Sequence, residues 1–210
     1  MITSNSKQGK FVVIDGPNGS GKTTLINNLA KNGYKTFTSP SGTPLAEILR
    51  APCRGVDCWS DIDKKIQFML FSAARYDEYV RLVQPSHGII CADRWWTSTY
   101  VYQCMLGGIS VNFLEYTIHP KEHIDLVVLL SAEPDVLAKR VEDDRKNTTH
   151  GTCSWTRDNE TLKIVHNLYT EALPRYLQQK NIPYSHIDTT QATPSMISES
   201  VMRILKEQLI

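Results

Sequence analysis

The octapeptide GPNGSGKT at residues 16–23 constrains this chain more than any other feature. It matches the pattern G-x-x-x-x-G-K-[ST], and it lies between an apolar run at residues 10–15 and helical apolar spacing at residues 22–31. A loop of this kind turns its backbone amides inward at a helix N-terminus, where phosphate oxygens bind. The sequence therefore predicts a strand, a phosphate-binding loop and a helix, in that order.

The residues of this loop have separate expected roles toward ATP. Lys22 supplies a positive charge to the β- and γ-phosphates, and the Thr23 hydroxyl is placed to ligate Mg²⁺. The predicted ATP-binding residues are Gly16, Pro17, Asn18, Gly19, Ser20, Gly21, Lys22, Thr23 and Thr24. The loop alone does not name a reaction, because motors, GTPases, transport ATPases and kinases share it.

The rest of the chain alternates between apolar runs and amphipathic segments. Further strands are predicted at residues 87–92, 126–130 and 183–188, and further helices at residues 61–83, 134–141, 159–179 and 194–208. This alternation predicts an α/β fold, with a doubly wound sheet of about five parallel strands flanked by helices. Ligands of such folds bind at the carboxyl ends of the strands.

Composition excludes several classes of function. The 210 residues contain no repeat or dividing linker, so we expect one domain, with residues 1–9 as a flexible N-terminus. With 23 basic and 22 acidic residues, the net charge of +1 provides no broad field for nucleic acid or an anionic membrane. No apolar run approaches the roughly 20 residues of a membrane span. We expect a cytoplasmic protein whose five cysteines are reduced thiols.

A charged pair follows the strand predicted at residues 87–92. Asp93 and Arg94 come at its carboxyl end, beside the expected phosphate loop. The planar fork of Arg94 can clamp an acceptor phosphate, and Asp93 can hold Mg²⁺ through water or orient that phosphate. The alternative for the pair is a surface salt bridge.

An aromatic ring and a cation share one face of the helix predicted just before this strand. Phe71 and Arg75 have the spacing i, i+4, so the ring and the guanidinium can stack on and hydrogen-bond a nucleobase. Core packing of Phe71 is an equal alternative from the spacing alone.

Five segments, in order, resemble the thymidylate kinase family over almost the whole chain. They are FVVIDGPNGSGKTTL, SPSGTPLAEILR, FSAAR, DRWWTSTYVYQ and HIDLVVLLSAEPDVLAKR. The resemblance implies a P-loop NTPase fold with a lid, and transfer of the ATP γ-phosphate to a deoxynucleoside monophosphate, most simply dTMP. It also implies Mg²⁺ as the cofactor and a homodimer.

The resemblance further implies which residues bind the acceptor. Phe71 stacks on the pyrimidine, Arg75 contacts its carbonyl edge, and Tyr102 crowds a ribose 2′-hydroxyl, which implies a deoxyribose. The implied substrate-binding residues are Asp15, Phe71, Arg75, Arg94, Ser98, Thr99, Tyr102 and Gln103. The metal site is expected at Thr23 and Asp93.

The chain departs from the family pattern at three places. Asn18 stands where relatives usually have an acid near the acceptor sugar, and Ser131 replaces an acid after a later strand. At residues 38–43, the sequence TSPSGT lacks the arginine of the family's Arg-Glu-Pro-Gly-Gly-Thr loop. Arg50 or Arg75 is the expected replacement for that base.

The polar stretch at residues 143–157 is predicted to be a lid over ATP. Phosphoryl transfer needs mobile positive charge, and this stretch contains Arg145, Lys146 and Arg157. Arg157 is the first choice for the catalytic arginine, and a solvated loop without function is the alternative. The predicted catalytic residues are Lys22, Asp93, Arg94 and Arg157.

Two other functions compete with this interpretation. A deoxynucleoside kinase needs a carboxylate to deprotonate a sugar hydroxyl, and Asp15 is the acid immediately before the loop. An ABC-type ATPase needs an LSGGQ-like signature, which the sequence lacks, as it lacks the Asn-Lys-x-Asp base reader of GTPases.

Overall fold

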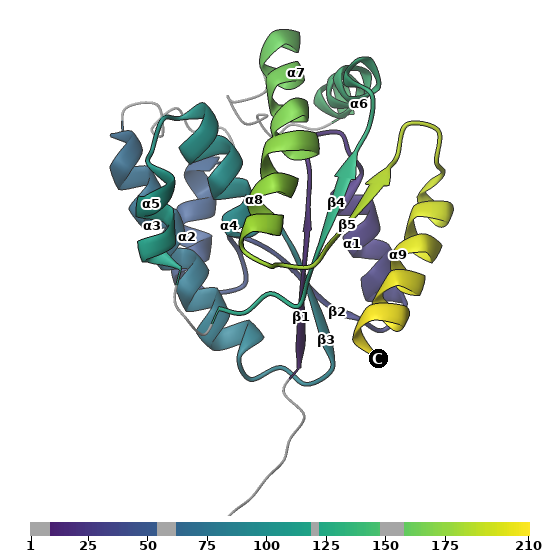
Figure 1. Cartoon of the computed structure of the whole chain (residues 1–210), viewed down its shortest axis with the longest axis horizontal. Helices are drawn as coiled ribbons and strands as arrows, with labels where there is room; N and C mark the ends of the chain where they lie inside the picture. The colour runs from purple at the N-terminus through teal and green to yellow at the C-terminus, as the bar shows by residue number, and fades with distance from the viewer. Residues whose placement is uncertain (1–8, 54–61, 119–121, 148–157) are drawn as a thin grey trace, which may run out of the picture.

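A five-stranded sheet forms the centre of the computed structural model, which describes residues 9–53, 62–118, 122–147 and 158–210. All its pairings are parallel, and the strand order is β2-β3-β1-β4-β5 (Figure 1). The strands are β1 Lys10–Asp15, β2 Lys35–Thr38, β3 Ile89–Asp93, β4 Leu126–Ser131 and β5 Tyr184–Asp188. This confirms the predicted α/β fold; β2 is the strand that the apolar pattern did not single out.

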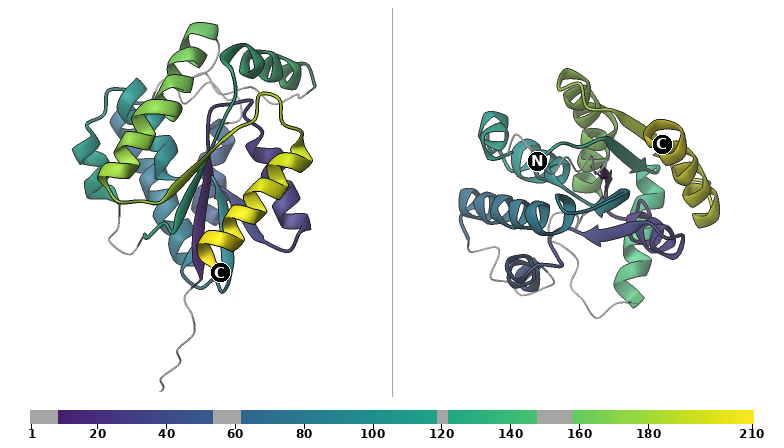
Figure 2. Two further views of the ribbon diagram at one scale, coloured as in Figure 1. Left: turned by 45° about the vertical axis from the view of Figure 1, so that its right-hand side comes forward. Right: turned by 90° about the horizontal axis from the view of Figure 1, so that it is seen from below.

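Helices cover both faces of the sheet. They are α1 Lys22–Lys31, α2 Pro44–Cys53, α3 Lys64–Glu78, α4 Trp96–Thr99, α5 Val111–Thr117, α6 Pro134–Asn147, α7 Asn159–Asn167, α8 Leu173–Gln179 and α9 Pro194–Leu209. Three π-helical segments continue α3, α4 and α7: η2 Tyr79–Val83, η3 Tyr100–Leu106 and η5 Leu168–Ala172. The helices α1 and α9 lie on one side, and α3, α4 and α8 on the other (Figures 1 and 2).

Alternation along β1 explains how one strand serves two cores. Phe11 and Val13 pack among α3, η3 and η5, whereas Val12 and Ile14 pack against α1 and α9. Successive side chains of a strand point to opposite faces, so a strand covered on both sides is apolar throughout. The polar residue that ends β1, Asp15, is thereby delivered to the carboxyl edge of the sheet.

Most predicted boundaries agree with the structure. The strand at residues 10–15 and the helix at residues 22–31 are observed with the predicted bounds. The helix predicted at residues 134–141 continues to Asn147, so the first residues of the predicted lid belong to α6. Residues 148–157 lie outside the described part of the chain. Within the described part, no helix is long and apolar enough to cross a membrane.

The helix α3 buries a different face from the one its apolar spacing suggests. Within the helix predicted at residues 61–83, the apolar side chains of Ile66 and Met69 in α3 and of Val80 in η2 are between 42% and 49% exposed. The buried residues of α3 are mostly polar or small: Gln67, Phe68, Ser72, Ala74, Arg75 and Glu78. Buried polar side chains need hydrogen-bond partners, so this face of α3 must be satisfied by contacts with other segments.

Candidate active site

The glycine-rich loop runs from the end of β1 into the N-terminus of α1. Gly19 has a positive φ of 81°, and a Cβ there would lie 2.8 Å from the Leu137 carbonyl oxygen, so the position requires glycine. Gly21 precedes α1 with a φ of 92°, and no side chain caps the helix. The amides of the first turn therefore have no side-chain cap, and a helix N-terminus of this kind can bind an anion.

Lys22 lies inside the curve of this loop. Its ammonium group donates to the carbonyl oxygens of Gly16 and Pro17, each at 2.8 Å, and its side chain is buried. Burial and the nearby Arg94 guanidinium lower the pKa of Lys22 to about 7. A phosphate placed beside it would raise that pKa again, because an anion favours the charged form of lysine.

Arg94 is held at the carboxyl end of β3 in an uncommon backbone conformation, with a φ of 72°. Its Nη2 donates to the Asn18 amide oxygen at 2.6 Å and its Nη1 to the Ser98 hydroxyl at 3.1 Å. The guanidinium lies 5.7 Å from the ring centre of Tyr102 and 3.7 Å from an Asp15 oxygen. These contacts hold the Arg94 guanidinium in a fixed position beside the glycine-rich loop.

Asp15 organises the residues around Arg94. This fully buried carboxylate accepts hydrogen bonds from the Gly16 amide at 2.8 Å, the Thr97 hydroxyl at 2.5 Å and the Ser98 hydroxyl at 2.9 Å. The Tyr169 hydroxyl donates to it at 2.9 Å from η5. Burial and the Asp15 charge raise the pKa of Tyr169 well above its ordinary value, so the phenol stays a donor.

Comparison with known proteins identifies the family of this chain. The family model for thymidylate kinase matches residues 14–191. The chain belongs to the thymidylate kinase family. The sequence is 28% identical to a thymidylate kinase of Shouchella clausii, over 94% of this chain and 95% of that protein. It is 27% identical to one of Halalkalibacterium halodurans, over 96% and 98%, and 26% identical to one of Ligilactobacillus salivarius, over 77% and 81%.

Arg75, which the sequence analysis expects to contact the base, forms a buried ion pair with Glu122. Its Nε donates to Glu122 at 3.1 Å and its Nη2 to the Thr117 carbonyl at 3.2 Å. Nη1 is buried and has no hydrogen-bond partner among the described residues. One nitrogen therefore remains for a ligand oxygen, with Phe71 half-buried one turn earlier on α3.

The donor set near the loop fits magnesium. Thr23 offers a hydroxyl oxygen and Asp93 a buried carboxylate, and hard cations prefer both kinds of ligand. Among the described residues, no cluster of three or more His, Cys, Asp and Glu could hold a metal by itself. Two oxygen ligands suit Mg²⁺, which usually shares its coordination with substrate phosphates and water.

Two residues that the sequence reasoning gave no role complete the site. Tyr169 bonds to Asp15 across 154 residues of sequence, a distance at which no local pattern is informative. Arg140 of α6 donates to the Thr189 carbonyl at 2.8 Å and to the Gly19 carbonyl at 3.3 Å, so it links the glycine-rich loop to the segment after β5. In the sequence, the only indication of a role for Arg140 is that it is the last residue of the family-like segment HIDLVVLLSAEPDVLAKR.

The remaining predicted residues lie as follows. Ser98 and Thr99 end α4, and Tyr102 and Gln103 follow in η3, all on the run after Arg94. Ser131, at the end of β4, is 2.8 Å from the ring of His186. The predicted lid residue Arg157 lies outside the described residues, and the side chains of Arg50 and Arg145 do too.

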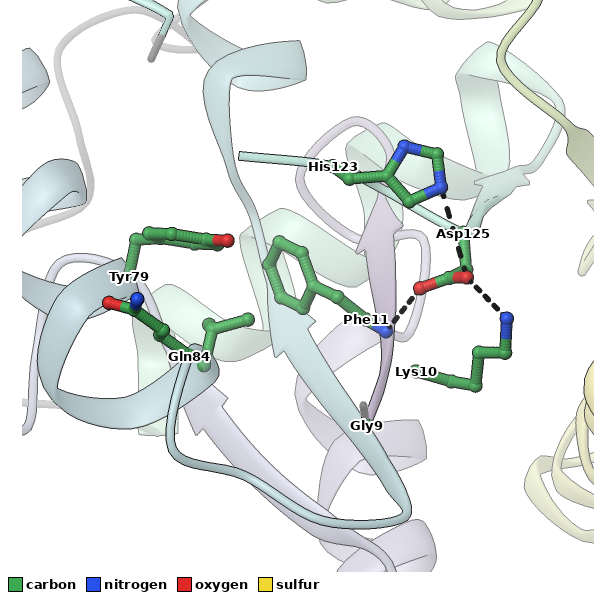
Figure 3. A pocket seen from close by; sticks show the side chains of 8 residues that line it. Gly9, Lys10, Phe11, Tyr79, Gln84, His123 and Asp125 are labelled. Atoms are coloured by element: carbon green, nitrogen blue, oxygen red, sulfur yellow. Dashed lines mark hydrogen bonds and ion pairs between the residues drawn. The ribbon is translucent and has the colours of Figure 1, made fainter. Parts of the chain in front are cut away.

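A separate hollow of about 200 Å³ lies at the amino end of β1, opposite the loop (Figure 3). Asp125 forms an ion pair with Lys10 at 2.9 Å and accepts from the Phe11 amide at 2.8 Å. The exposed His123 ring lies 3.8 Å from the same carboxylate. Lys10 and His123 both lie against the Asp125 carboxylate, so the positive charge at this hollow is already paired. We therefore place the phosphate chemistry at the opposite edge of the sheet, at the carboxyl ends of the strands.

Proposed function

We propose that this protein transfers the γ-phosphate of ATP to dTMP, forming dTDP and ADP. The observation that carries this proposal is the pair of anion sites on adjacent strands: the loop with Lys22 after β1, and Arg94 after β3. A donor phosphate on the loop and an acceptor phosphate on Arg94 would then face each other. Since free nucleotides are its substrates and the buried Cys91 and Cys104 are free thiols, we also place the protein in the cytoplasm.

The reaction requires the protein mainly to position the donor and acceptor phosphates and to neutralise their charge. The loop amides and Lys22 hold the β- and γ-phosphates, and Arg94 holds the acceptor phosphate in line. Thr23 and Asp93 would hold Mg²⁺, which neutralises charge on the phosphates when bound. The attacking phosphate oxygen is already ionised at neutral pH, so no general base is needed. Arg157 of the lid, with Arg145 as the alternative, is proposed to stabilise the transferring group.

The state of Asp15 argues against a deoxynucleoside kinase. Such an enzyme needs a carboxylate free to take a proton from a sugar hydroxyl. Asp15 is fully buried and already accepts hydrogen bonds from Thr97, Ser98 and Tyr169. It supports Arg94 instead, and Arg94 would have no anionic ligand in a nucleoside complex.

An assay of ADP release across acceptors tests the proposed function. We expect turnover with dTMP, weaker turnover with dUMP, and none above background with thymidine, dGMP or dAMP. Arg75 has only donors, so dCMP, which carries an amino group in place of the carbonyl, should be a poor substrate. Turnover of thymidine without turnover of dTMP would replace the proposal by a nucleoside kinase. ADP release that needs no acceptor would indicate an ATPase.

We propose that the homodimer implied by the resemblance forms through the exposed face of α3 and η2. The exposed residues Ile66, Met69, Tyr76 and Val80 form a stripe about Ala73. A twofold axis through Ala73 would set Ile66 against Val80 and Met69 near Tyr76 of a second, antiparallel copy. A stripe with this internal symmetry is self-complementary, as an isologous interface requires.

Light scattering after size exclusion tests this interface. We expect a dimer for the wild type and a monomer for Ala73→Arg, because two like charges would meet at the axis. Ile164→Arg on α7 is the matched control, since Ile164 is equally exposed at 50% but lies off the stripe. A dimer that survives Ala73→Arg, or a wild-type monomer, would contradict the proposal.

A further inference from the structure

The loop at residues 39–43, which joins β2 to α2, is fastened to α3 by one buried carboxylate. Glu78 is 0% exposed; its Oε2 accepts from the Ser39 hydroxyl and its Oε1 from the Ser41 amide, both at 2.5 Å. The Ser39 amide donates to the Asp93 carbonyl at 2.9 Å. The loop is therefore tied both to α3 and to the strand that delivers Arg94.

Glu78 shares a face of α3 with the residues assigned to the nucleobase. Phe71, Arg75 and Glu78 are spaced i, i+4 and i+7, so they follow one another along the helix. The segment TSPSGT at residues 38–43 has no basic side chain, unlike the corresponding loop of the family. It can contribute to an acceptor site only through the placement of its backbone and hydroxyl groups.

We propose that Glu78 is a positioning residue for the acceptor nucleotide, which holds residues 39–43 in the shape that closes the acceptor site. The Ser39 hydroxyl and the Ser41 amide are the two points at which it holds the loop. This inference rests on the proposed function and adds a residue that touches neither phosphate nor base. It also explains why a glutamate is buried on a helix, where an unpartnered carboxylate would be strongly unfavourable.

The protonation of Glu78 supplies a readout that a merely structural residue would lack. Burial raises the pKa of Glu78 to about 7, although the hydrogen bonds from Ser39 and Ser41 oppose the shift. Of the elements packed around it, α3 brings the charged Arg75 and Asp77, β3 ends at Asp93, and the loop brings no titratable side chain.

The sign of the pH effect follows from the hydration of this carboxylate. When the loop leaves, water returns to Glu78 and its pKa falls toward the ordinary value of 4.5. A group whose pKa is raised in the closed state favours that state while it is protonated. Loop closure should therefore weaken as the pH rises from about 4.5 to about 7, and it should not change further above pH 7.

Steady-state kinetics of variants test the role of Glu78. We expect Glu78→Ala to raise the KM for dTMP about tenfold, since two hydrogen bonds to the loop are lost. The KM for ATP should stay within about twofold. Glu47→Ala is the matched control, because the exposed Glu47 also accepts from a loop amide, that of Gly42 at 3.0 Å. A wild-type KM for dTMP in Glu78→Ala, or an equal rise in both KM values, would overturn the inference.

The isostere Glu78→Gln provides a second test, with kinetics measured between pH 5 and 8.5. Its carbonyl can accept from Ser41 and its amide can donate to Ser39, so the loop stays closed without titrating. The ratio of wild-type to variant KM for dTMP should rise as the pH increases toward 7 and level off above pH 7, and titration of the acceptor phosphate cancels in that ratio. A flat ratio overturns the inference, even if Glu78→Ala does not fold.

The two proposals fail in different ways. A wild-type protein that phosphorylates no deoxynucleoside monophosphate refutes the proposed function. Hydrogen exchange of the amides at residues 39–43 still tests Glu78. If the negative charge of Glu78 holds the loop, exchange at pH 6 should be faster in Glu78→Gln than in the wild type; if the hydrogen bonds alone hold it, the rates should be equal. Faster exchange there overturns the assigned role, and exchange equal to that of the wild type supports it.

Discussion

Replacing Arg94 by alanine is expected to lower kcat/KM for dTMP by about 10²- to 10⁴-fold, which corresponds to two charge-assisted hydrogen bonds. The guanidinium is held by Asn18, Ser98 and the Asp15 charge, so it is oriented before any acceptor arrives. Lysine at this position would keep the charge but lose the fork, and Arg94→Lys should recover only part of the activity. Kinetics with varied dTMP at saturating ATP and Mg²⁺ measure both variants.

The control for this prediction is an arginine with an ordinary surface ion pair. Arg175 pairs with Glu171 at 3.3 Å, and both side chains are largely exposed, so Arg175→Ala should leave kcat/KM unchanged. The fold should survive Arg94→Ala, because Asp15 retains donors from Gly16, Thr97 and Tyr169. If Arg94→Ala phosphorylates dTMP at the wild-type rate, the acceptor site is not at the end of β3.

The parts of this molecule that follow local rules could be predicted from the sequence. Residues 10–15 alternate between two cores and residues 16–23 carry glycines where φ is positive, so strand, loop and helix were each determined by their own residues. The same holds for Asp93 and Arg94, which follow from the end of an apolar strand. Such features need no knowledge of the rest of the chain.

The partners of buried polar side chains could not be predicted, because they come from distant segments. Arg75 meets Glu122, 47 residues later, and Ser39 meets Glu78, 39 residues later. A glutamate on a helix is usually solvated, so nothing in the local sequence indicates that Glu78 is buried. For the same reason, the spacing of apolar residues predicted burial of the wrong face of α3: the structure buries the face that carries most of its polar side chains.

Replacing Lys22 by alanine is expected to lower kcat by at least about 10²-fold, as the loss of one fixed donor to a reacting oxyanion does. The ammonium is the cation that the loop encloses, bonded to the carbonyls of Gly16 and Pro17. Lys31→Ala at the exposed end of α1 is the matched control and should have no effect. Single-turnover measurements separate the chemical step from product release.

The pH dependence of ATP binding provides the sharper test of Lys22. Its pKa of about 7 is that of the free protein, and a bound triphosphate raises it, so binding takes up a proton above pH 7. Affinity should then fall about tenfold per pH unit between pH 7 and the pKa of the complex. Lys22→Arg stays charged throughout, so its affinity should not change over this range. Equal pH dependence in both proteins, measured by calorimetry, would show that Lys22 does not carry the charge that recognises ATP.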